Sequence, residues 1–565
     1  MKEANRVIVS DNNDITYKSL AEALENPLKV HKLSLIGQQL TRLPKELYQL
    51  KNLRRLYLTG NQIEKLDPEI GSLLNLELLE LIGNKLSILP PEIAGLKKLK
   101  QLYLVNNKLK ELPAEIGQLS SLEGLWLELN QLTTLPSGFT ELKNLQLLEL
   151  NQNTLSEIPS DIGNMTGLQV LKLSGNGIER LPDSICRLDK LMGLFLNENL
   201  LTSLPEDMHK LSSLVKLDLR KNKIASLPPG FGDLSSLREL YLGDNALPEL
   251  PDGLGALSRL QKLDLRHNSL TKLPEDFGDL SALESLAVEG NYLTDLPQSC
   301  GKLKALTVLE LNNNKLEALP PQIASLNNIK ELYLSGNELR EFPPEIFQFE
   351  GLTSLALAGN RLREIPGSIE KLSALERLWL ENNGLTSLPE EMTALKELLV
   401  VRLDHNELEV LPSAFGSFQK LRELYLGHNK LSDLPSESVH LKSLMLLDLS
   451  YNHFRTLPDV IGSLTALKGL WADGNVLEDL PEAMANLRDL HGLGLNHNKL
   501  RTLPSAMGAL SLLQELYLAH NEITHFPPEI QGCESLKWLN LENNPLTEEG
   551  KGKINLYFPR CEIRF

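Results

Sequence analysis

Apolar and polar positions alternate along the chain in a frame that repeats every 23 residues. One copy of the frame reads Leu76-x-x-Leu79-x-Leu81-x-x-Asn84-x-Leu86-x-x-Leu89-Pro90-x-x-Ile93-x-x-Leu96. The Leu-x-Leu part has the two-residue period of a β-strand, so its leucines are predicted to face a core and the residues between them to face outward. The regular proline excludes a continuous helix on the return arm and predicts short helical or 3₁₀ turns there.

An asparagine recurs once in each frame, 22 times from Asn61 to Asn544, and Gln38 stands one step before the first of them. An amide at a strand end can bond backbone groups that would otherwise be buried without a partner. The asparagines are therefore predicted to stack as a buried structural ladder. Its members include Asn61, Asn84, Asn107, Asn291, Asn314, Asn521 and Asn544.

A single repeat cannot bury enough apolar surface to fold alone, so consecutive repeats must stack on one another. The predicted fold class is an α/β solenoid with a parallel β-sheet on its concave face. Its convex arms are expected to be 3₁₀, short helical or irregular. We expect an N-terminal cap with a short helix over residues 1–31, about 23 repeats over residues 32–546, and a C-terminal cap over residues 547–565.

Each predicted cap has its own helical signal. In the N-terminal cap, Tyr17, Leu20 and Leu24 have helical spacing, and the helix is expected to stop at Pro27. In the C-terminal cap, Thr547 can start a helix that ends near Phe558. The residues expected to close the last coil are Cys561, Ile563 and Phe565.

The composition argues against several classes of function. The net charge of −17 argues against nucleic acid and anionic membranes as partners, and no apolar run is long enough to span a bilayer. There is no nucleophile elbow, phosphate loop, zinc-protease motif or calcium loop. We therefore predict no enzymatic activity, no catalytic residue, no cofactor and no metal. The first ten residues lack a signal-peptide pattern, which predicts a cytoplasmic protein, or a secreted or cell-surface one if a signal peptide has been removed.

The frame with Leu112-Pro-Ala-Glu-Ile-Gly117 resembles the Ras-suppressor and scribble type of leucine-rich repeat, and the fold it implies is a horseshoe. The two ends, over residues 17–27 and 544–561, look like the caps of bacterial leucine-rich repeat proteins of spirochaetes and bacteroidetes. This resemblance implies a non-enzymatic scaffold that binds a protein partner. It also implies an alternative role as a surface adhesin that binds a host protein or a glycan.

Function is expected at the positions that the frame leaves free. With each ladder asparagine as position zero, the predicted concave face is built from positions −6, −4, −2 and −1, and all four tryptophans fall there. Tyrosine and tryptophan suit a surface that is wet until a partner covers it. The residues predicted to bind a partner are Tyr241, Glu331, Tyr333, Trp379, Glu423, Tyr425, Trp471, Asp473 and Tyr517. The alternative, that these rings only stack between neighbouring strands, stays open.

Charge on the predicted face is uneven. A central basic stretch contains Lys172, Lys216, Arg220, Lys221, Lys262 and Arg266. From Glu289 to Glu542, by contrast, ten carboxylates meet only Arg377 and Arg402, which predicts a basic protein segment as the partner. Histidines stand before the ladder asparagine, and the pairs His405/His428 and His497/His520 on adjacent coils could share a metal or simply fill a turn.

Overall fold

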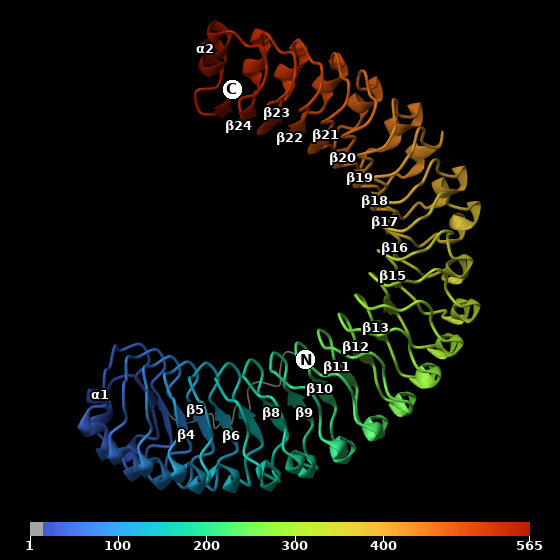
Figure 1. The fold of residues 1–565 in the computed structure, drawn as a ribbon. Helices are drawn as coiled ribbons and strands as arrows, with labels where there is room; N and C mark the ends of the chain where they lie inside the picture. The colour runs from blue at the N-terminus through green and yellow to red at the C-terminus, as the bar shows by residue number, and fades with distance from the viewer. Residues whose placement is uncertain (1–14) are drawn as a thin grey trace. The chain divides into compact units, whose positions relative to one another are not determined.

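A computed structural model describes residues 15–565, which divide into two compact units, unit 1 up to residue 283 and unit 2 over residues 284–565. The first fourteen residues lie outside the described residues. They include part of the predicted N-terminal cap and the ten residues in which no signal-peptide pattern was found. In both units the chain runs as coils of 23 residues, each with one short strand and one 3₁₀ turn (Figure 1).

Unit 1, over its described residues 15–283, contains a parallel sheet and one short helix, α1 (Leu20–Leu24). Between successive repeats of unit 1, neighbouring strands pair at a constant offset, for example Leu33 with Leu56 and Leu171 with Leu194. The strands are β1 (Thr16–Tyr17), β2 (Lys32–Ser34), β3 (Arg55–Tyr57), β4 (Leu78–Glu80), β5 (Gln101–Tyr103), β6 (Gly124–Trp126), β7 (Leu147–Glu149), β8 (Val170–Lys172), β9 (Gly193–Phe195), β10 (Lys216–Asp218), β11 (Glu239–Tyr241) and β12 (Lys262–Asp264).

Unit 2 has the same design, and its strands line the inner side of its curve while the 3₁₀ turns lie on the outer side (Figure 1). It ends with helix α2 (Glu548–Tyr557) and a last strand that pairs with the one before it. The strands are β13 (Ser285–Ala287), β14 (Val308–Glu310), β15 (Glu331–Tyr333), β16 (Ser354–Ala356), β17 (Arg377–Trp379), β18 (Val400–Arg402), β19 (Glu423–Tyr425), β20 (Leu446–Asp448), β21 (Gly469–Trp471), β22 (Gly492–Gly494), β23 (Glu515–Tyr517), β24 (Trp538–Asn540) and β25 (Glu562–Arg564).

The core of each coil is made by the apolar positions of the frame. In the copy that contains Asn84, all seven leucine and isoleucine positions are at most 1% exposed. The return arm turns as a 3₁₀ segment over Pro91–Gly95, with Pro90 extended just before it. The predicted fold class, a solenoid with a parallel sheet on one face and 3₁₀ arms on the other, is therefore confirmed in both units.

The asparagine ladder has the contacts that were predicted for it. Asn84 donates from Nδ2 to the carbonyls of Leu58 and Leu81, at 3.0 and 3.1 Å, and accepts from the backbone N–H of Ile63 at 3.0 Å. The side chain thus ties its own coil to the one before it. Most ladder members are buried, with Asn291 only 4% exposed.

The residue before each ladder asparagine lies in the left-handed region of the backbone, with φ of 52° at His267 and 55° at His405. Glycine, asparagine and aspartate adopt this conformation most easily, and the same position holds glycine in other coils. The recurrent histidines are therefore turn residues, as one of the two sequence interpretations proposed.

The N-terminal cap differs from its prediction. Tyr17 is not helical, because Thr16–Tyr17 forms β1 and pairs in parallel with β2. Helix α1 therefore begins only at Leu20 and ends at Leu24. The exposed edge of β2 offers backbone groups that need partners, and strand pairing satisfies them better than another helical turn would.

At the C-terminus, Thr547 precedes α2, and its Oγ1 accepts the N–H of Gly550 at 3.1 Å. The expectation for Phe565 was wrong, since it is 38% exposed. Ile554 and Phe558, which are 1% and 6% exposed, are buried at this end instead.

Candidate functional site on the strand face of unit 2

The outward side chains of the strands, and the residues at position −2 that follow them, form a surface that we name the strand face. In unit 2 an aromatic residue ends every second strand from β15 to β23, and each ring is partly exposed. These aromatic residues are Tyr333, Trp379, Tyr425, Trp471 and Tyr517. Small or charged residues, such as Ala356 and Gly494, end the strands between them.

Each tyrosine of this row is held by a glutamate two residues earlier, on the same side of the same strand. The phenolic O–H of Tyr333 donates to the carboxylate of Glu331 at 2.6 Å. The equivalent hydrogen bonds, from Tyr425 to Glu423 and from Tyr517 to Glu515, are both 3.1 Å long. Burial, together with the charge of Glu331, raises the pKa of Tyr333 to about 12. These hydrogen bonds hold the three tyrosine rings in a defined orientation.

The two tryptophans lean toward tyrosines two strands away. The ring centroids of Tyr333 and Trp379 are 6.3 Å apart across Ala356, and those of Trp471 and Tyr517 are 5.9 Å apart across Gly494. Both pairs are tilted, at 37° and 50°. In unit 1, by contrast, Tyr103 and Trp126 lie on adjacent strands and stack flat at 4.0 Å.

Carboxylates flank this aromatic row. Burial raises the pKa values of Glu381, Asp404 and Asp473 above their usual range. One buried oxygen of Glu381 has no hydrogen-bond donor among the described residues. The guanidinium of Arg402 lies over the ring of Tyr425, 4.6 Å from its centroid, and is 3.7 Å from Asp404. The surface therefore has buried acceptors that its own cations do not fully satisfy.

Five of the six cations in the basic stretch of unit 1, all except Lys262, form ion pairs with carboxylates of unit 1. Lys172 pairs with Glu149, and Lys216 pairs with Glu239 at 2.6 Å. Arg220, Lys221 and Arg266 form the corresponding ion pairs with Asp218, Glu198 and Asp264. Each of these pairs joins neighbouring coils or two residues of the same coil, so the charge of these five cations is balanced locally.

The structure does not bring all of the predicted binding residues together. Tyr241 belongs to unit 1, where Lys216 and Arg220 lie 5.0 and 4.9 Å from its ring centroid and its O–H donates to Glu239. Its ring already has cationic partners. The other eight predicted residues lie in unit 2, on or directly after the strands of the strand face.

The histidine pairs are stacked rings. His405 and His428 have centroids 4.0 Å apart, His428 continues onto Tyr451 at 4.3 Å, and His497 and His520 are 4.2 Å apart. Over residues 15–565, no three His, Cys, Asp or Glu side chains lie close enough to hold a metal ion. The two-histidine metal hypothesis therefore has no third ligand there.

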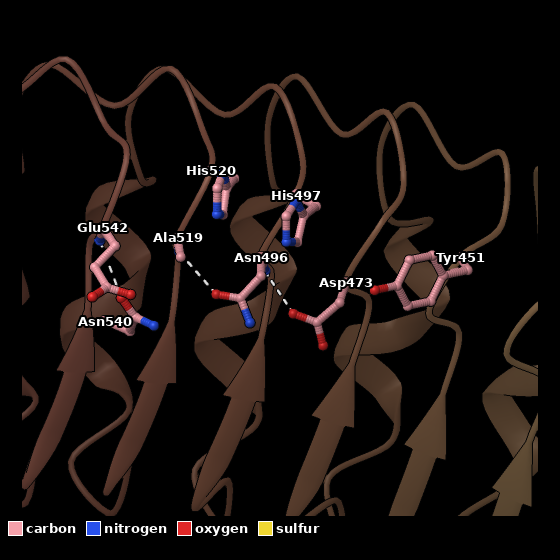
Figure 2. Close-up of a pocket in the computed structure, with 8 residues that line it drawn as sticks. All are labelled: Tyr451, Asp473, Asn496, His497, Ala519, His520, Asn540 and Glu542. Carbon is pink, nitrogen blue, oxygen red and sulfur yellow. Dashed lines mark hydrogen bonds between the residues drawn. The ribbon is translucent and has the colours of Figure 1, made fainter.

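Sequence reasoning missed a cavity of about 400 Å³ at the C-terminal end of the strand face (Figure 2). It lies beyond the ends of β20 to β24 and is lined by Asp473, Asn496, Asn540 and Glu542, with His497 and His520 above them. The signal that could have located it is position −2 of four consecutive repeats, which supplies the lining residues Asp473, Asn496, Ala519 and Glu542.

None of the helices among residues 15–565 has the length and apolar character needed to cross a bilayer. No curated protein matches the chain by sequence. Among solved structures, a plant peptide hormone receptor, RGFR1 in complex with RGF2, is similar with 29% identity and a TM-score of 0.71. The similarity covers 91% of this chain and 89% of that one.

Two further solved structures are similar over most of their length. The Arabidopsis receptor kinase HAESA, in complex with the peptide hormone IDA and the co-receptor SERK1, has 27% identity and a TM-score of 0.61, covering 92% of this chain and 83% of that one. YopM from Yersinia enterocolitica WA-314 has 26% identity and a TM-score of 0.60, covering 94% and 93%.

Family models match most of the sequence. The leucine rich repeat model matches segments that together cover residues 51–155, 212–477 and 488–546, and a leucine-rich repeat region model matches residues 139–201. These matches span more than half of the chain and coincide with the coils of both units. The chain belongs to the leucine-rich repeat family.

Proposed function

We propose that the protein is a non-enzymatic scaffold whose strand face in unit 2 binds a basic, extended protein segment. The single observation that carries this proposal is the row of five aromatic residues on alternate strands, set among carboxylates that outnumber the cations. Aromatic residues commonly anchor protein interfaces, while complementary charge steers the partner toward them.

The spacing of the row suits a segment that crosses the strands. Neighbouring strands lie about 4.7–4.9 Å apart, so aromatic residues on alternate strands recur about every 9.5 Å. An extended chain covers that distance in about three residues. The row from Tyr333 to Tyr517 spans eight strand steps, which about twelve extended residues would cover.

The competing interpretation, that the rings only brace neighbouring strands, fits unit 1 better than unit 2. Tyr103 and Trp126 stack flat on adjacent strands, whereas the five rings of unit 2 are separated by an intervening strand and tilted where they approach one another. Their partly exposed faces remain accessible to a ligand. Residence in a bacterial cell, in the cytoplasm or at a surface, stays a prediction, as does the alternative role as an adhesin.

The test is a selection of short random peptides of about twelve residues against the immobilised full chain. We expect enrichment of Lys and Arg with apolar residues about every third position, and binding that weakens as salt is added. Trp379→Ala should weaken the selected peptides about thirtyfold, the loss that a hot-spot aromatic of about 2 kcal/mol carries.

The matched control is Tyr292→Ala, because Tyr292 is an aromatic residue of unit 2 that is 50% exposed but lies outside the row. It should leave affinity unchanged. Selection of neutral or acidic peptides, or an equal loss in both variants, would overturn the proposal. So would a Trp379→Ala variant that lowers the melting temperature and binds as before.

A further inference from the structure

Among residues 15–565 three strands end in an aspartate, and two of these aspartates are paired with an arginine. Asp218 ends β10 and Asp264 ends β12. Arg220, two residues after Asp218, donates to both of its carboxylate oxygens, from Nε at 3.0 Å and from Nη2 at 2.5 Å. Arg266 donates to Asp264 in the same way, at 3.0 and 2.9 Å. In both coils the aspartate thus forms a bidentate pair with a guanidinium of its own coil.

Asp448 ends β20, the third of these strands, and lacks such a partner. The residue two positions later is Ser450, whose backbone N–H donates to Oδ1 of Asp448 at 2.9 Å. The backbone N–H of Arg220 donates to Oδ1 of Asp218 at 3.2 Å, so the backbone holds the two carboxylates in the same way. In the described part of the chain no cation pairs with Asp448, and no group donates to its Oδ2. This oxygen is therefore left for a donor from another molecule.

In both places an aromatic ring stands beside the aspartate on the next strand. Asp218 is in register with Tyr241, and Asp448 is in register with Trp471. In unit 1 the guanidinium of Arg220 pairs with Asp218 and also lies over Tyr241, 4.9 Å from the ring centroid. Unit 1 therefore shows, within this chain, how one guanidinium uses a strand-end aspartate and the neighbouring ring together.

The ring of Trp471 is partly exposed, and no cation of the described residues lies over it. The indole extends toward β22, where a Cβ at Gly492 would meet Cη2 at 3.4 Å. Arg402, on β18, lies over Tyr425 instead, 4.6 Å from that ring centroid. Beside Asp448, unit 2 thus has the carboxylate and the ring of the unit 1 arrangement without its arginine.

This geometry favours a guanidinium over an ammonium group. A guanidinium is planar, so it can stack on an indole while two of its N–H groups donate to one carboxylate. An ammonium is a compact, strongly hydrated charge without that fork. The surrounding charge favours a cation as well. Burial raises the pKa of Asp473 most, and the charge of Asp448 acts in the same direction, so the two carboxylates lie close enough to interact.

We propose that Asp448 and Trp471 bind an arginine side chain of the partner protein, as Asp218 and Tyr241 bind Arg220. This inference rests on the proposed function, in which the strand face of unit 2 binds a basic segment. It adds which basic residue is selected and where on the face it binds. A segment that has only lysines would still be attracted by the carboxylates of the face, but it would lose this contact.

The probes are two peptides of equal charge and about twelve residues, one of repeated Gly-Gly-Arg units and one of repeated Gly-Gly-Lys units. Their basic residues recur about every third position, which is the spacing of the aromatic row. Calorimetric titration of the full chain at one salt concentration should show the arginine peptide binding about tenfold more tightly. Asp448→Asn keeps the oxygen that accepts the N–H of Ser450 and removes the charge, so it should abolish most of this preference.

The matched control is Asp404→Asn, which removes the same charge from the same face at a carboxylate that has Arg402 3.7 Å away. It should weaken both peptides alike and keep the preference for arginine. Loss of the preference in Asp404→Asn as well would show that it depends on the total charge of the face, and would overturn the inference.

A second variant tests the same site in the opposite direction. Ser450→Arg places two residues after Asp448 the arginine that unit 1 has after Asp218, and its guanidinium should occupy the site and abolish the preference. Ser335→Arg adds the same charge at the same position of another coil, where Tyr333 stands in place of the aspartate, and should keep the preference.

The inference is overturned if the wild type binds the two peptides equally, or if the preference for arginine survives Asp448→Asn or Ser450→Arg. In these cases the binding of a basic segment, and with it the proposed function, still stands. If neither peptide binds, the inference and the proposed function fail together.

Discussion

The indole of Trp471 lies so close to Gly494 on the next strand that a Cβ at the glycine would stand 2.5 Å from Cε3. Oδ2 of Asp473 would lie at the same distance from that Cβ. The backbone of Gly494 is not in the left-handed region, so its conformation does not require glycine. Glycine is needed here because a side chain would not fit. A single absent side chain therefore determines where an aromatic ring and a carboxylate of the strand face can lie.

The first prediction follows from this contact. Gly494→Ala should force the indole off β22 and cost about 1–3 kcal/mol of stability, as overpacking commonly does. Denaturant unfolding and tryptophan emission would be measured in a background in which Trp126, Trp379 and Trp538 are phenylalanine. Gly469→Ala is the control, because its Cβ would meet Nε1 of Trp471 at an ordinary 3.5 Å. Equal behaviour of the two variants would show that the close contact has no structural role.

Most of the fold could be predicted because the same 23-residue pattern recurs in every repeat of the chain. The strand period places Trp379 and Tyr425 on the strand face, and the polar ladder explains how a buried asparagine is tolerated. What could not be predicted depends on side-chain contacts. The pattern does not show that Lys216 is neutralised by Glu239, or that the side-chain oxygen of Asn496 accepts the backbone N–H of Ala519. Tyr17 was wrongly predicted to be helical, because the spacing of apolar residues carries no information about the edge of β2, with which Tyr17 pairs as a strand.

The second prediction concerns a carboxyl group in unit 1. Burial, and then the charge of Glu149, raises the pKa of Glu128 from 4.5 to about 7, and one of its buried oxygens has no donor among the described residues. Between these two pH values the folded protein keeps a proton that the unfolded chain has lost. Stability should therefore fall as pH rises through this interval.

Glu128→Gln removes the ionising group and should make the protein more stable than the wild type above pH 7, with little difference near pH 4. Denaturant midpoints across this range measure the effect. Glu111→Gln, a change at an exposed side chain of the same unit, is expected to leave the pH dependence as it was. Parallel curves for the wild type and Glu128→Gln would contradict the assignment.

The third prediction concerns the stack of His405, His428 and Tyr451. Burial of the His428 ring, and then the neighbouring His405, lowers its pKa below 6.5, although Asp448 and Asp404 act in the opposite direction. A nuclear magnetic resonance titration should therefore find His428 less protonated than an ordinary histidine at the same pH. His405→Asn, which keeps a residue suited to the left-handed turn, should move this pKa upward.

The control for this titration is His267→Asn, since His267 has the same turn geometry in unit 1. It should leave the titration of His428 unchanged. A His428 that titrates at or above 6.5, or that does not respond to His405→Asn, would show that the stacked rings do not influence one another electrostatically.

The last prediction tests the ladder that stabilises every coil. Asn314 donates from Nδ2 to the carbonyls of Val288 and Leu311 at 3.0 and 3.1 Å and accepts the N–H of Leu293 at 3.0 Å. It is 7% exposed, so Asn314→Ala leaves these backbone groups buried without the partner, at a cost of about 1–3 kcal/mol. The control is Asn328→Ala, because Asn328 is exposed and makes one bond, to the carbonyl of Lys304. Equilibrium denaturation should show a clearly lower midpoint for Asn314→Ala alone. If both variants unfold with the wild type, the ladder contributes no stability through its hydrogen bonds, and the leucine core alone must hold neighbouring coils together.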